Sequence, residues 1–226
     1  MIPRSQDKEM LDVMTPPIGE LRKAMRHMAW TNRVFLNNWL IGCYVKKLIG
    51  KASKASILDI GTGIADIPKY LVEKLNRKDR IIIATGIDID PQVLALAREY
   101  VGNASGVTIL EKPLEEIPDH QFTVAVMSQM LHHLNPEEAV AMLRTAHAKV
   151  TNGVIISDFI RSRFNYYLAK WSIALTFGSK FNKSDGPLSI LRSYTDNEIK
   201  QMLHQAGINK YEIKNYLIRK IVIIYK

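Results

Sequence analysis

The length, composition and cysteine content of the chain limit what kind of protein it can be. With 226 residues, 47% of them hydrophobic and 23% charged, it has the composition of one globular domain with a buried core. A single cysteine, Cys43, excludes an internal disulfide framework and a zinc site made of cysteines. The first eleven residues lack the apolar stretch of a signal peptide, and no apolar run approaches the roughly 20 residues that cross a bilayer. We therefore expect a cytoplasmic protein.

The net charge of +9 is unevenly distributed along the chain. Residues 1–50 carry eight Lys or Arg and four Asp or Glu, residues 51–160 carry eleven and fourteen, and residues 161–226 carry twelve and four. A mildly acidic centre is thus flanked by two basic segments. A basic surface attracts nucleic acid, anionic lipid or an acidic substrate, but a solvated lysine-rich surface has the same composition. Composition alone leaves these alternatives open.

The first fifty residues have a helical pattern. A short helix is predicted from Ser5 to Met14, and a longer helical region with one break from Ile18 to Ile49. Asn32 lies on the apolar stripe of this region, where a buried polar side chain needs a partner. It either bonds the neighbouring backbone or contacts a cofactor or substrate from an N-terminal lid. We predict that residues 1–50 form a helical cap on a second unit, residues 51–226.

The stretch from Ser56 to Leu71, S-I-L-D-I-G-T-G-I-A-D-I-P-K-Y-L, predicts a strand, a tight glycine turn and a helix. The strand covers Ile57 to Ile60 and ends in Asp59, and Gly61-Thr62-Gly63 makes the turn. Such a unit points backbone N–H groups at a ligand, although G-x-G is also typical of any tight strand–helix turn. Asp66, in the first helical turn, either meets a positive group of the ligand or complements the helix N-terminus.

The next predicted strand also ends in an acidic residue. Arg80 to Ile87 is an apolar run, and Asp88-Ile89-Asp90-Pro91 follows it. An acid about 20 to 30 residues after a glycine turn is placed to accept hydrogen bonds from ribose hydroxyls, so Asp88 is the candidate. Asp90 precedes Pro91 and is expected to cap the following helix.

Strands and helices alternate from residue 57 to residue 158, which is typical of a parallel sheet covered by helices on both faces. Expected strands are 57–60, 81–87, 106–110, 122–127 and 153–158, and expected helices are 64–75, 91–101 and 136–149. Near the C-terminus, a helix over 195–206 and two strands over 208–213 and 217–225 are predicted, the strands as a hairpin.

Four motifs in this region resemble the class I S-adenosylmethionine-dependent methyltransferases. They are L-D-I-G-T-G-I-A-D, G-I-D-I-D-P, F-T-V-A-V-M-S-Q-M-L-H-H-L and A-K-V-T-N-G-V-I-I-S-D-F. The resemblance covers about residues 56–159 and departs from the family twice. Ala65 stands where the third glycine usually lies, and Glu111-Lys112-Pro113-Leu114 stands where an aspartate often faces the adenine amino group.

The resemblance implies a Rossmann-like α/β fold with a mostly parallel sheet in the order 3-2-1-4-5-7-6, and S-adenosyl-L-methionine as the cofactor. It implies that backbone groups around Leu114 hold the adenine ring. The implied cofactor-binding residues are Asp59, Gly61, Thr62, Gly63, Asp66, Asp88, Ile89, Leu114 and Ser128.

Two histidines follow the fourth predicted strand, beside the expected position of the transferred methyl group. His132 and His133 are expected in a loop, because Asn135-Pro136-Glu137 begins a helix. A phenol-type acceptor must lose a proton that an imidazole can take, so His133, ahead of His132, is the candidate catalytic base. Structural hydrogen bonding or shielding of the cofactor is the alternative. The spacing of the histidines indicates no metal site, and none is expected.

Residues 161–192 interrupt the alternation and are predicted to form a lid after the fifth strand. An apolar stripe with basic residues at its edges is formed by Phe164, Tyr167, Leu168, Trp171 and Leu175. Such a helix covers a substrate pocket, lies on a membrane surface or packs on the N-terminal helix. We predict that the stripe faces the methyl-transfer centre opposite the histidines and that, with Asn32, it contacts the substrate.

The sequence thus predicts a methyltransferase that acts on a small aromatic or lipid-like acceptor, preferably at oxygen. The segment Asp185 to Tyr194 has a weaker similarity to small methyltransferases of aromatic polyketide and phenolic-lipid pathways. One alternative is a nucleic-acid methyltransferase, which the basic flanks favour but which lacks the expected N/D-P-P-Y/F motif after the fourth strand. The other is a non-catalytic S-adenosylmethionine-binding subunit. Peripheral membrane contact is a further hypothesis, and the sequence does not indicate an oligomeric state.

Overall fold

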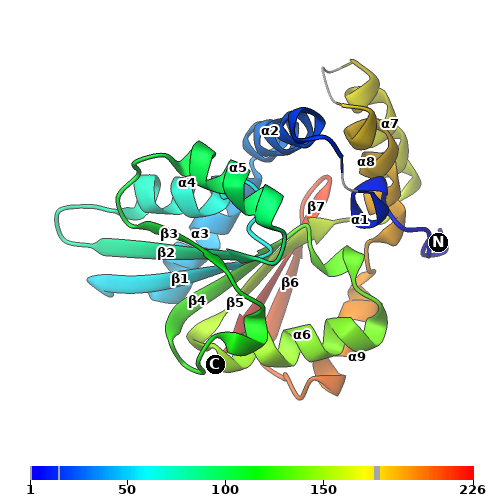
Figure 1. Cartoon of the computed structure of the whole chain (residues 1–226). Coiled ribbons are helices and arrows are strands. Elements are labelled where there is room, and N and C mark those ends of the chain that lie inside the picture. The colour runs from blue at the N-terminus through cyan, green and yellow to red at the C-terminus, as the bar shows by residue number, and fades with distance from the viewer. Residues whose placement is uncertain (1, 15, 176–178) are drawn as a thin grey trace.

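The structure of the protein is a computed structural model that describes residues 2–14, 16–175 and 179–226, and its strands form one seven-stranded sheet (Figure 1). The strands are β1 Lys54–Ile60, β2 Ile81–Asp88, β3 Val107–Glu111, β4 Phe122–Ser128, β5 Val150–Phe159, β6 Tyr211–Asn215 and β7 Arg219–Tyr225. Their order is β3-β2-β1-β4-β5-β7-β6. The first five run parallel, and β7 is antiparallel to both β5 and β6. The predicted fold class and strand order are therefore confirmed.

Helices lie on both faces of this sheet and beyond its carboxyl end. They are α1 Met10–Val13, α2 Ile18–Val34, α3 Asn37–Ile49, α4 Asp66–Leu75, α5 Pro91–Val101, α6 Pro136–Ala148, α7 Arg163–Leu175, α8 Lys180–Arg192 and α9 Asp196–Gln205, with short 3₁₀ turns η1 Leu114–Glu116 and η2 Leu131–His133. The predicted cap at Asp90 is confirmed, because its side chain accepts hydrogen bonds from the Gln92 and Val93 N–H groups. None of the described helices is long and apolar enough to cross a membrane.

The hydrophobic core is divided by the sheet into two layers. On one face α3 and α4 pack against residues such as Ile57, Val124 and Ile155. On the other face α6 and α9 pack against alternate residues of the same strands, such as Leu58 and Ala125. Because successive strand residues point to opposite faces, continuous apolar strands are buried on both sides. Helix α3 is thus part of the core, whereas the division of the chain into a cap, 1–50, and a second unit, 51–226, stays a prediction.

The N-terminal segment differs from its prediction. Only Met10–Val13 is helical, because the residues before it are extended and bond a distant part of the chain. The Ser5 N–H donates to the Leu191 carbonyl (3.1 Å), and Arg4 donates to the Arg192 carbonyl (2.7 Å). The break expected between Ile18 and Ile49 lies at Leu36, whose φ of 57° is left-handed.

Four helices gather at the carboxyl end of the sheet. Helices α7 and α8 form a pair, and α8 also contacts α1, α2 and η2 (Figure 1). The predicted lid, 161–192, corresponds to α7 and α8, and its residues 176–178 lie outside the described part of the chain. In an open α/β sheet, ligands bind beyond this end of the strands, so the lid lies over the expected site.

Candidate active site

The turn after β1 needs glycine-like backbone at three positions. Gly61 has φ 66°, Gly63 has φ 54°, and Ala65 has φ 61°. Glycine adopts this left-handed region without a steric cost, whereas alanine incurs one. The turn also packs tightly on β2, since a Cβ on Gly86 would lie 2.5 Å from the Thr62 Oγ1. The glycine turn is therefore fixed by its own backbone and by β2.

Two buried carboxylates lie beside this turn. Asp59 accepts a hydrogen bond from the Thr62 hydroxyl (2.7 Å), and burial raises the pKa of Asp59 to about 8. Asp66 accepts hydrogen bonds from Asn38 (3.0 Å) and Asn32 (3.3 Å), and burial raises its pKa as well. These carboxylates have neutral hydrogen-bond donors here, so a cationic ligand would stabilise their ionised forms.

Asp88, at the end of β2, faces the same turn. Its carboxylate accepts hydrogen bonds from the backbone N–H groups of Gly63 (3.2 Å), Ile89 (2.8 Å) and Asp90 (3.2 Å). Burial raises the pKa of Asp88 despite these bonds. A carboxylate held in this way is oriented toward the space above the glycine turn, as a ribose-binding residue requires.

The remaining predicted cofactor residues differ in what they can offer. Ile89 is 74% exposed, so its apolar side chain can lie against a flat ring. Leu114 is buried in the core, so only its backbone can face a ligand. Ser128, at the end of β4, accepts a hydrogen bond from the Asn37 side chain (3.0 Å).

Asn32 joins the two sides of the site. It is buried, and it donates to Asp66 on the side of the glycine turn. Its Oδ1 accepts from Gln129, the residue after β4, and from Arg219 Nη2 (3.2 Å). Asn32 therefore bonds side chains of the site and not the neighbouring backbone.

A cavity of about 330 Å³ lies under the lid, against the residues that follow β4. Its lining is mostly apolar, and it includes Met25, Phe35, Phe159, Leu168, Phe181 and Ile190. Polar groups enter it at Gln129, Arg219 and the histidine pair. An apolar cavity with a few grouped polar side chains is the usual form of a small-molecule site.

The predicted lid stripe is wrong about which face of α7 points inward. Phe164, Tyr167 and Trp171 are 61%, 55% and 67% exposed, and none of them lines the cavity. Of the predicted stripe, Leu168 does line the cavity, beside Asn165, Ala169 and Ser172. Helix α7 packs closely on α8 here, where a Cβ on Gly186 would lie 2.2 Å from the Ile173 Cδ1. Helix periodicity showed the stripe but not its direction.

His132 is buried, which corrects the prediction of two histidines in an open loop. It lies in the turn η2, and its Nδ1 is 2.7 Å from the Asp158 Oδ1 at the end of β5. Its backbone N–H donates to the other oxygen of Asp158 (3.2 Å). Burial alone would lower the pKa of His132, but Asp158 and Glu9 together raise it to about 9. His133 is the preferred candidate from the sequence, whereas the structure places His132 in the more constrained position.

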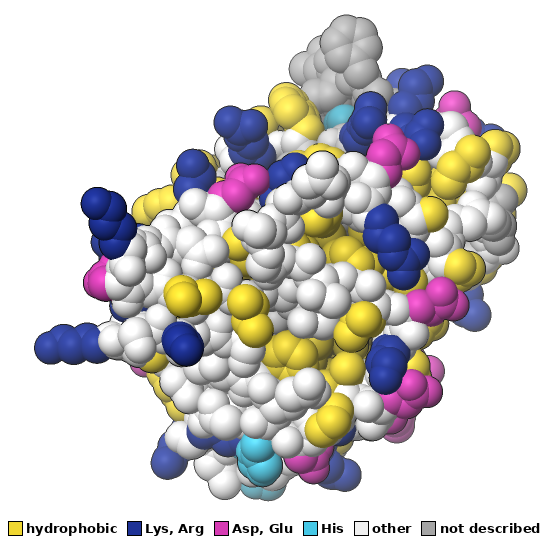
Figure 2. All heavy atoms as spheres, turned by 60° about the vertical axis from the view of Figure 1, so that its left-hand side comes forward, with side chains coloured by type: hydrophobic (Ala, Val, Ile, Leu, Met, Phe, Trp, Pro, Cys, Tyr) yellow, Lys and Arg dark blue, Asp and Glu magenta, His cyan; other side chains and the backbone are white. Residues whose placement is uncertain are grey.

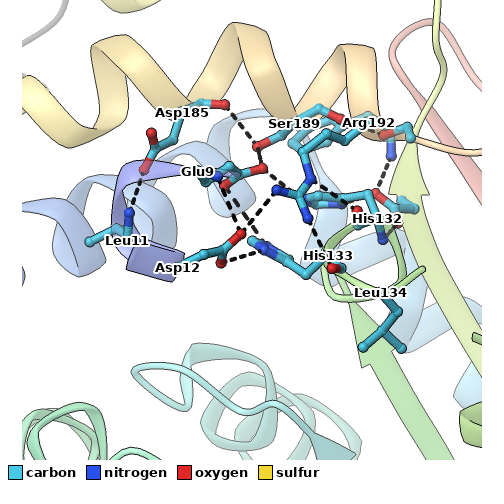
Figure 3. Close-up of polar contacts among 12 residues, drawn as sticks. Glu9, Leu11, Asp12, His132, His133, Leu134, Asp185, Ser189 and Arg192 are labelled. Atoms are coloured by element: carbon cyan, nitrogen blue, oxygen red, sulfur yellow. Dashed lines mark hydrogen bonds and ion pairs between the residues drawn. The ribbon is translucent and has the colours of Figure 1, made fainter. Parts of the chain in front are cut away.

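His133 is partly exposed and is held in a similar way. Its Nδ1 is 2.9 Å from the Asp12 Oδ1, and its ring lies 4.3 Å from the His132 ring, centroid to centroid. Figure 3 shows that both rings point toward Glu9, which comes from the N-terminal segment. The Glu9 oxygens lie 3.5 Å from the His132 Nε2 and 3.9 Å from the His133 Nε2.

Arg192, at the end of α8, bonds both Asp12 and the backbone of the histidine pair. Its guanidinium pairs with Asp12 (3.0 Å) and donates to the backbone carbonyls of His132 (3.2 Å) and His133 (2.9 Å) (Figure 3). Ser189, one turn earlier on α8, donates to the Glu9 Oε1 (2.8 Å). The histidine pair is therefore enclosed by α1, α8 and β5.

Arg219 is a buried cation at the wall of the cavity. Its guanidinium lies 4.9 Å from the centre of the Phe159 ring, and burial lowers its pKa to about 10. Within the described residues, its Nε and Nη1 atoms have no hydrogen-bond partner. A buried donor needs an acceptor, which a molecule bound in the cavity or an ordered water would supply.

Sequence reasoning missed Glu9, Asp12, Arg192 and Arg219. None of them lies in a local motif, and their partners are distant in the chain. Asp158 had a signal, because the carboxyl ends of the adjacent strands β4 and β5 meet at one edge of the sheet. That edge brings Asp158 beside the residues that follow Ser128.

Comparison with known proteins agrees with the fold. A family model described as a methyltransferase domain matches residues 57–153. No curated protein gives a significant match.

Several solved structures are similar. A plantazolicin methyltransferase with bound S-adenosylhomocysteine is 16% identical, with a TM-score of 0.64 and coverage of 92% of this chain and 96% of that one. The magnesium protoporphyrin IX methyltransferase of Synechocystis PCC 6803 is 16% identical, with a TM-score of 0.57 and coverage of 84% and 83%. Human N-acetylserotonin methyltransferase is 14% identical, with a TM-score of 0.65 and coverage of 93% and 56%. At these identities the likeness is one of fold.

Proposed function

We propose that the protein is a class I S-adenosylmethionine-dependent methyltransferase, as the methyltransferase-domain model that matches residues 57–153 supports, and that it methylates an oxygen atom of a small aromatic or lipid-like acceptor. The observation that carries this proposal is the apolar cavity under α7 and α8, which adjoins the end of β4. Its volume of about 330 Å³ suits a small molecule, and its lining suits rings or alkyl chains. Among its polar lining residues, Glu9, His132 and His133 lie together, where they can hold an oxygen atom of the acceptor.

S-adenosylmethionine carries a sulfonium, an ammonium and a carboxylate. The part of the site beside the glycine turn, with its buried carboxylates, suits the two cations. We assign Asp88 to the ribose hydroxyls and the exposed Ile89 to the adenine ring. Asp66 is assigned to the ammonium group, because it is buried and has only amide donors. The turn Gly61-Thr62-Gly63, with Asp59 behind it, supports the methionine part of the cofactor.

Methyl transfer is then an in-line displacement at the methyl carbon. Bound S-adenosylmethionine would supply the methyl group: the acceptor oxygen would bond the methyl carbon as the carbon–sulfur bond broke, with the electron pair staying on sulfur as a neutral thioether. The hydroxyl proton would leave toward Glu9 and His133 on the polar wall, because the raised pKa of His132 leaves that ring already protonated near neutral pH. Since the sulfonium is already activated, positioning of the acceptor and exclusion of water by the lid supply much of the acceleration.

The two alternative functions make different demands on the site. A nucleic-acid enzyme needs an extended basic groove, whereas Figure 2 shows Lys and Arg scattered among acidic and neutral side chains on the face it displays. A non-catalytic binding subunit needs no acceptor cavity. The enclosed cavity favours the small-molecule enzyme over both.

We also propose that α7 rests on an anionic membrane surface. Phe164, Tyr167 and Trp171 all point outward from it, and the same helix carries Arg163 and Lys170 but no acidic residue. Aromatic side chains with basic neighbours are typical of helices that lie in the membrane interface. A lipid-like acceptor could then enter the cavity from the membrane.

The test of the function is methyl transfer by the purified protein from labelled S-adenosylmethionine to a panel of phenols, long-chain alcohols and amines. The label should appear on oxygen, located by fragmentation of the product in mass spectrometry. Ala169 lines the cavity, so Ala169→Phe should raise the KM of the acceptor and leave cofactor affinity unchanged.

Lys170→Phe is the matched control, because Lys170 is exposed on the outer side of the same helix turn. If both variants lowered activity equally, or if the label appeared only on nitrogen, the proposed acceptor site would be wrong.

A further inference from the structure

Three side chains from two distant parts of the chain converge beside the cavity. The ligating atoms of Glu9, His132 and His133 all lie within 4.8 Å of one another (Figure 3). The Glu9 Oε1 is 3.5 Å from the His132 Nε2, and the Glu9 Oε2 is 3.9 Å from the His133 Nε2. These separations are longer than a good hydrogen bond. Two ligands of one tetrahedral metal ion, each about 2.1 Å from it, lie roughly 3.4 Å apart.

The outer nitrogen of each histidine is already held by a carboxylate. The Nδ1 of His132 bonds Asp158 (2.7 Å), and the Nδ1 of His133 bonds Asp12 (2.9 Å). Both rings therefore turn their Nε2 atoms toward Glu9. Carboxylates that bond the second nitrogen of a ligating histidine fix its tautomer and orientation in metalloproteins.

The charges around the three residues also suit a divalent cation. Glu9 and Asp158 are buried, Asp12 is partly buried, and together they bring three carboxylates to the histidine pair. Arg192 pairs with Asp12 and compensates one of them. A doubly charged ion between the histidines would compensate the negative charge that remains, and it would displace the proton from the His132 Nε2 that it binds.

From these contacts we propose that Glu9, His132 and His133 form a binding site for a divalent transition-metal ion. Two imidazoles and one carboxylate are a ligand set of zinc and iron(II) and not of magnesium, which prefers oxygen ligands. This proposal departs from the expectation that the chain holds no metal site. The expectation failed to consider Glu9, which lies 123 positions before His132 in the sequence.

Such a site would be open on one side. All three residues line the cavity, so a bound ion would leave coordination positions free for a hydroxyl of a molecule in that cavity. A metal-bound hydroxyl has a lowered pKa, which would make it a better nucleophile. The metal site itself does not depend on the proposed methyl acceptor and can be tested without activity.

The experiment is titration of the purified full chain, freed of metal by a chelator, with Zn²⁺ and with Co²⁺. We expect one ion per chain by calorimetry, and visible cobalt absorption that indicates nitrogen and oxygen ligands in a low-symmetry site. Mg²⁺ should not compete. Glu9→Gln keeps the Ser189 hydrogen bond and should abolish stoichiometric binding, as should His133→Gln.

Asp12→Asn tests the carboxylate that orients His133, and it should weaken zinc binding about 10- to 100-fold. The matched control is His204→Gln, since His204 is an exposed histidine on α9. Thermal unfolding of each variant shows whether it is folded. The test uses the single variants Glu9→Gln and His133→Gln because His132 is buried and its replacement could prevent folding. Binding that is absent in the wild type, or that survives in both Glu9→Gln and His133→Gln, would overturn the proposal.

Discussion

The two sides of the candidate site are held together by different means. On the cofactor side, the turn between β1 and α4 bonds its own neighbours and β2, as when the Gly63 N–H donates to Asp88, 25 residues later. On the acceptor side, side chains bond across nearly the whole chain, as when Arg192 donates to the Asp7 carbonyl, 185 residues earlier. The first side is a property of one strand–turn–helix unit. The second exists only when the N-terminal segment, η2 and α8 are together.

This difference predicts different consequences of mutation. Changes on the cofactor side should alter ligand affinity or protonation and leave the sheet intact. Changes on the acceptor side should loosen several elements together, because one side chain such as Arg192 serves three of them.

The largest effect is expected for Arg192→Ala. The side chain is buried, and its removal takes a donor away from Asp12 and from three backbone carbonyls. A hydrogen bond to a charged group contributes about 1.5–3 kcal/mol, so the loss of several costs about 3–5 kcal/mol in total. We expect a loss of that size in the free energy of unfolding measured with urea, and faster amide exchange over residues 4–13. Arg163→Ala, on the exposed side of α7, should change it by less than about 0.5 kcal/mol.

On the cofactor side, Asp88→Ala should weaken binding of S-adenosylhomocysteine by about 1–3 kcal/mol, through loss of charge-assisted hydrogen bonds to the ribose. Calorimetry measures this change directly. The exposed Asp79 provides the control variant Asp79→Ala, which should bind as the wild type does. Unchanged affinity in Asp88→Ala would place the ribose elsewhere.

The buried Asp59 predicts a dependence of stability on pH. Its pKa is near 3.9 in an unfolded chain and about 8 in the folded protein, so between these values the folded state holds the proton more tightly. The free energy of unfolding should therefore fall as pH rises from 4 to 8, by at most about 1.4 kcal/mol per pH unit from this group. Asp59→Asn can still accept the Thr62 hydrogen bond and should lack this contribution. Urea unfolding of both proteins at pH 5 and pH 7.5 tests this. If the free energy of unfolding changed by the same amount between the two pH values in both proteins, Asp59 would not have the raised pKa.

The smallest effect on the fold is expected for Trp171→Ala. Because this side chain is 67% exposed, stability should change by less than about 0.5 kcal/mol, and the KM of a water-soluble acceptor should not change. Binding to vesicles that contain anionic lipid should nevertheless weaken. Leu168→Ala, on the cavity side of the same helix, should show the opposite pattern, with a raised KM and unchanged vesicle binding.

The sequence was a good guide where local pattern determines structure. The glycine turn, the acid at the end of β2 and the cap at Asp90 all depend on residues close together in the chain. The sequence was a poor guide where tertiary packing decides. Nothing near Glu9 indicates that it meets His132, and the periodicity of α7 could not show that Trp171 faces outward.

The contacts of the N-terminal segment also determine when, during synthesis of the chain, the acceptor side of the site can form. Arg4 bonds the Arg192 carbonyl, so 188 residues separate the first and last members of this contact. At roughly 5–20 residues per second, a ribosome needs about 10–40 s to make the chain between them. During that interval, the cofactor half of the sheet can already form while Glu9 and Asp12 have no α8 to join. In a newly made molecule, the acceptor wall should therefore close later than the cofactor half of the sheet.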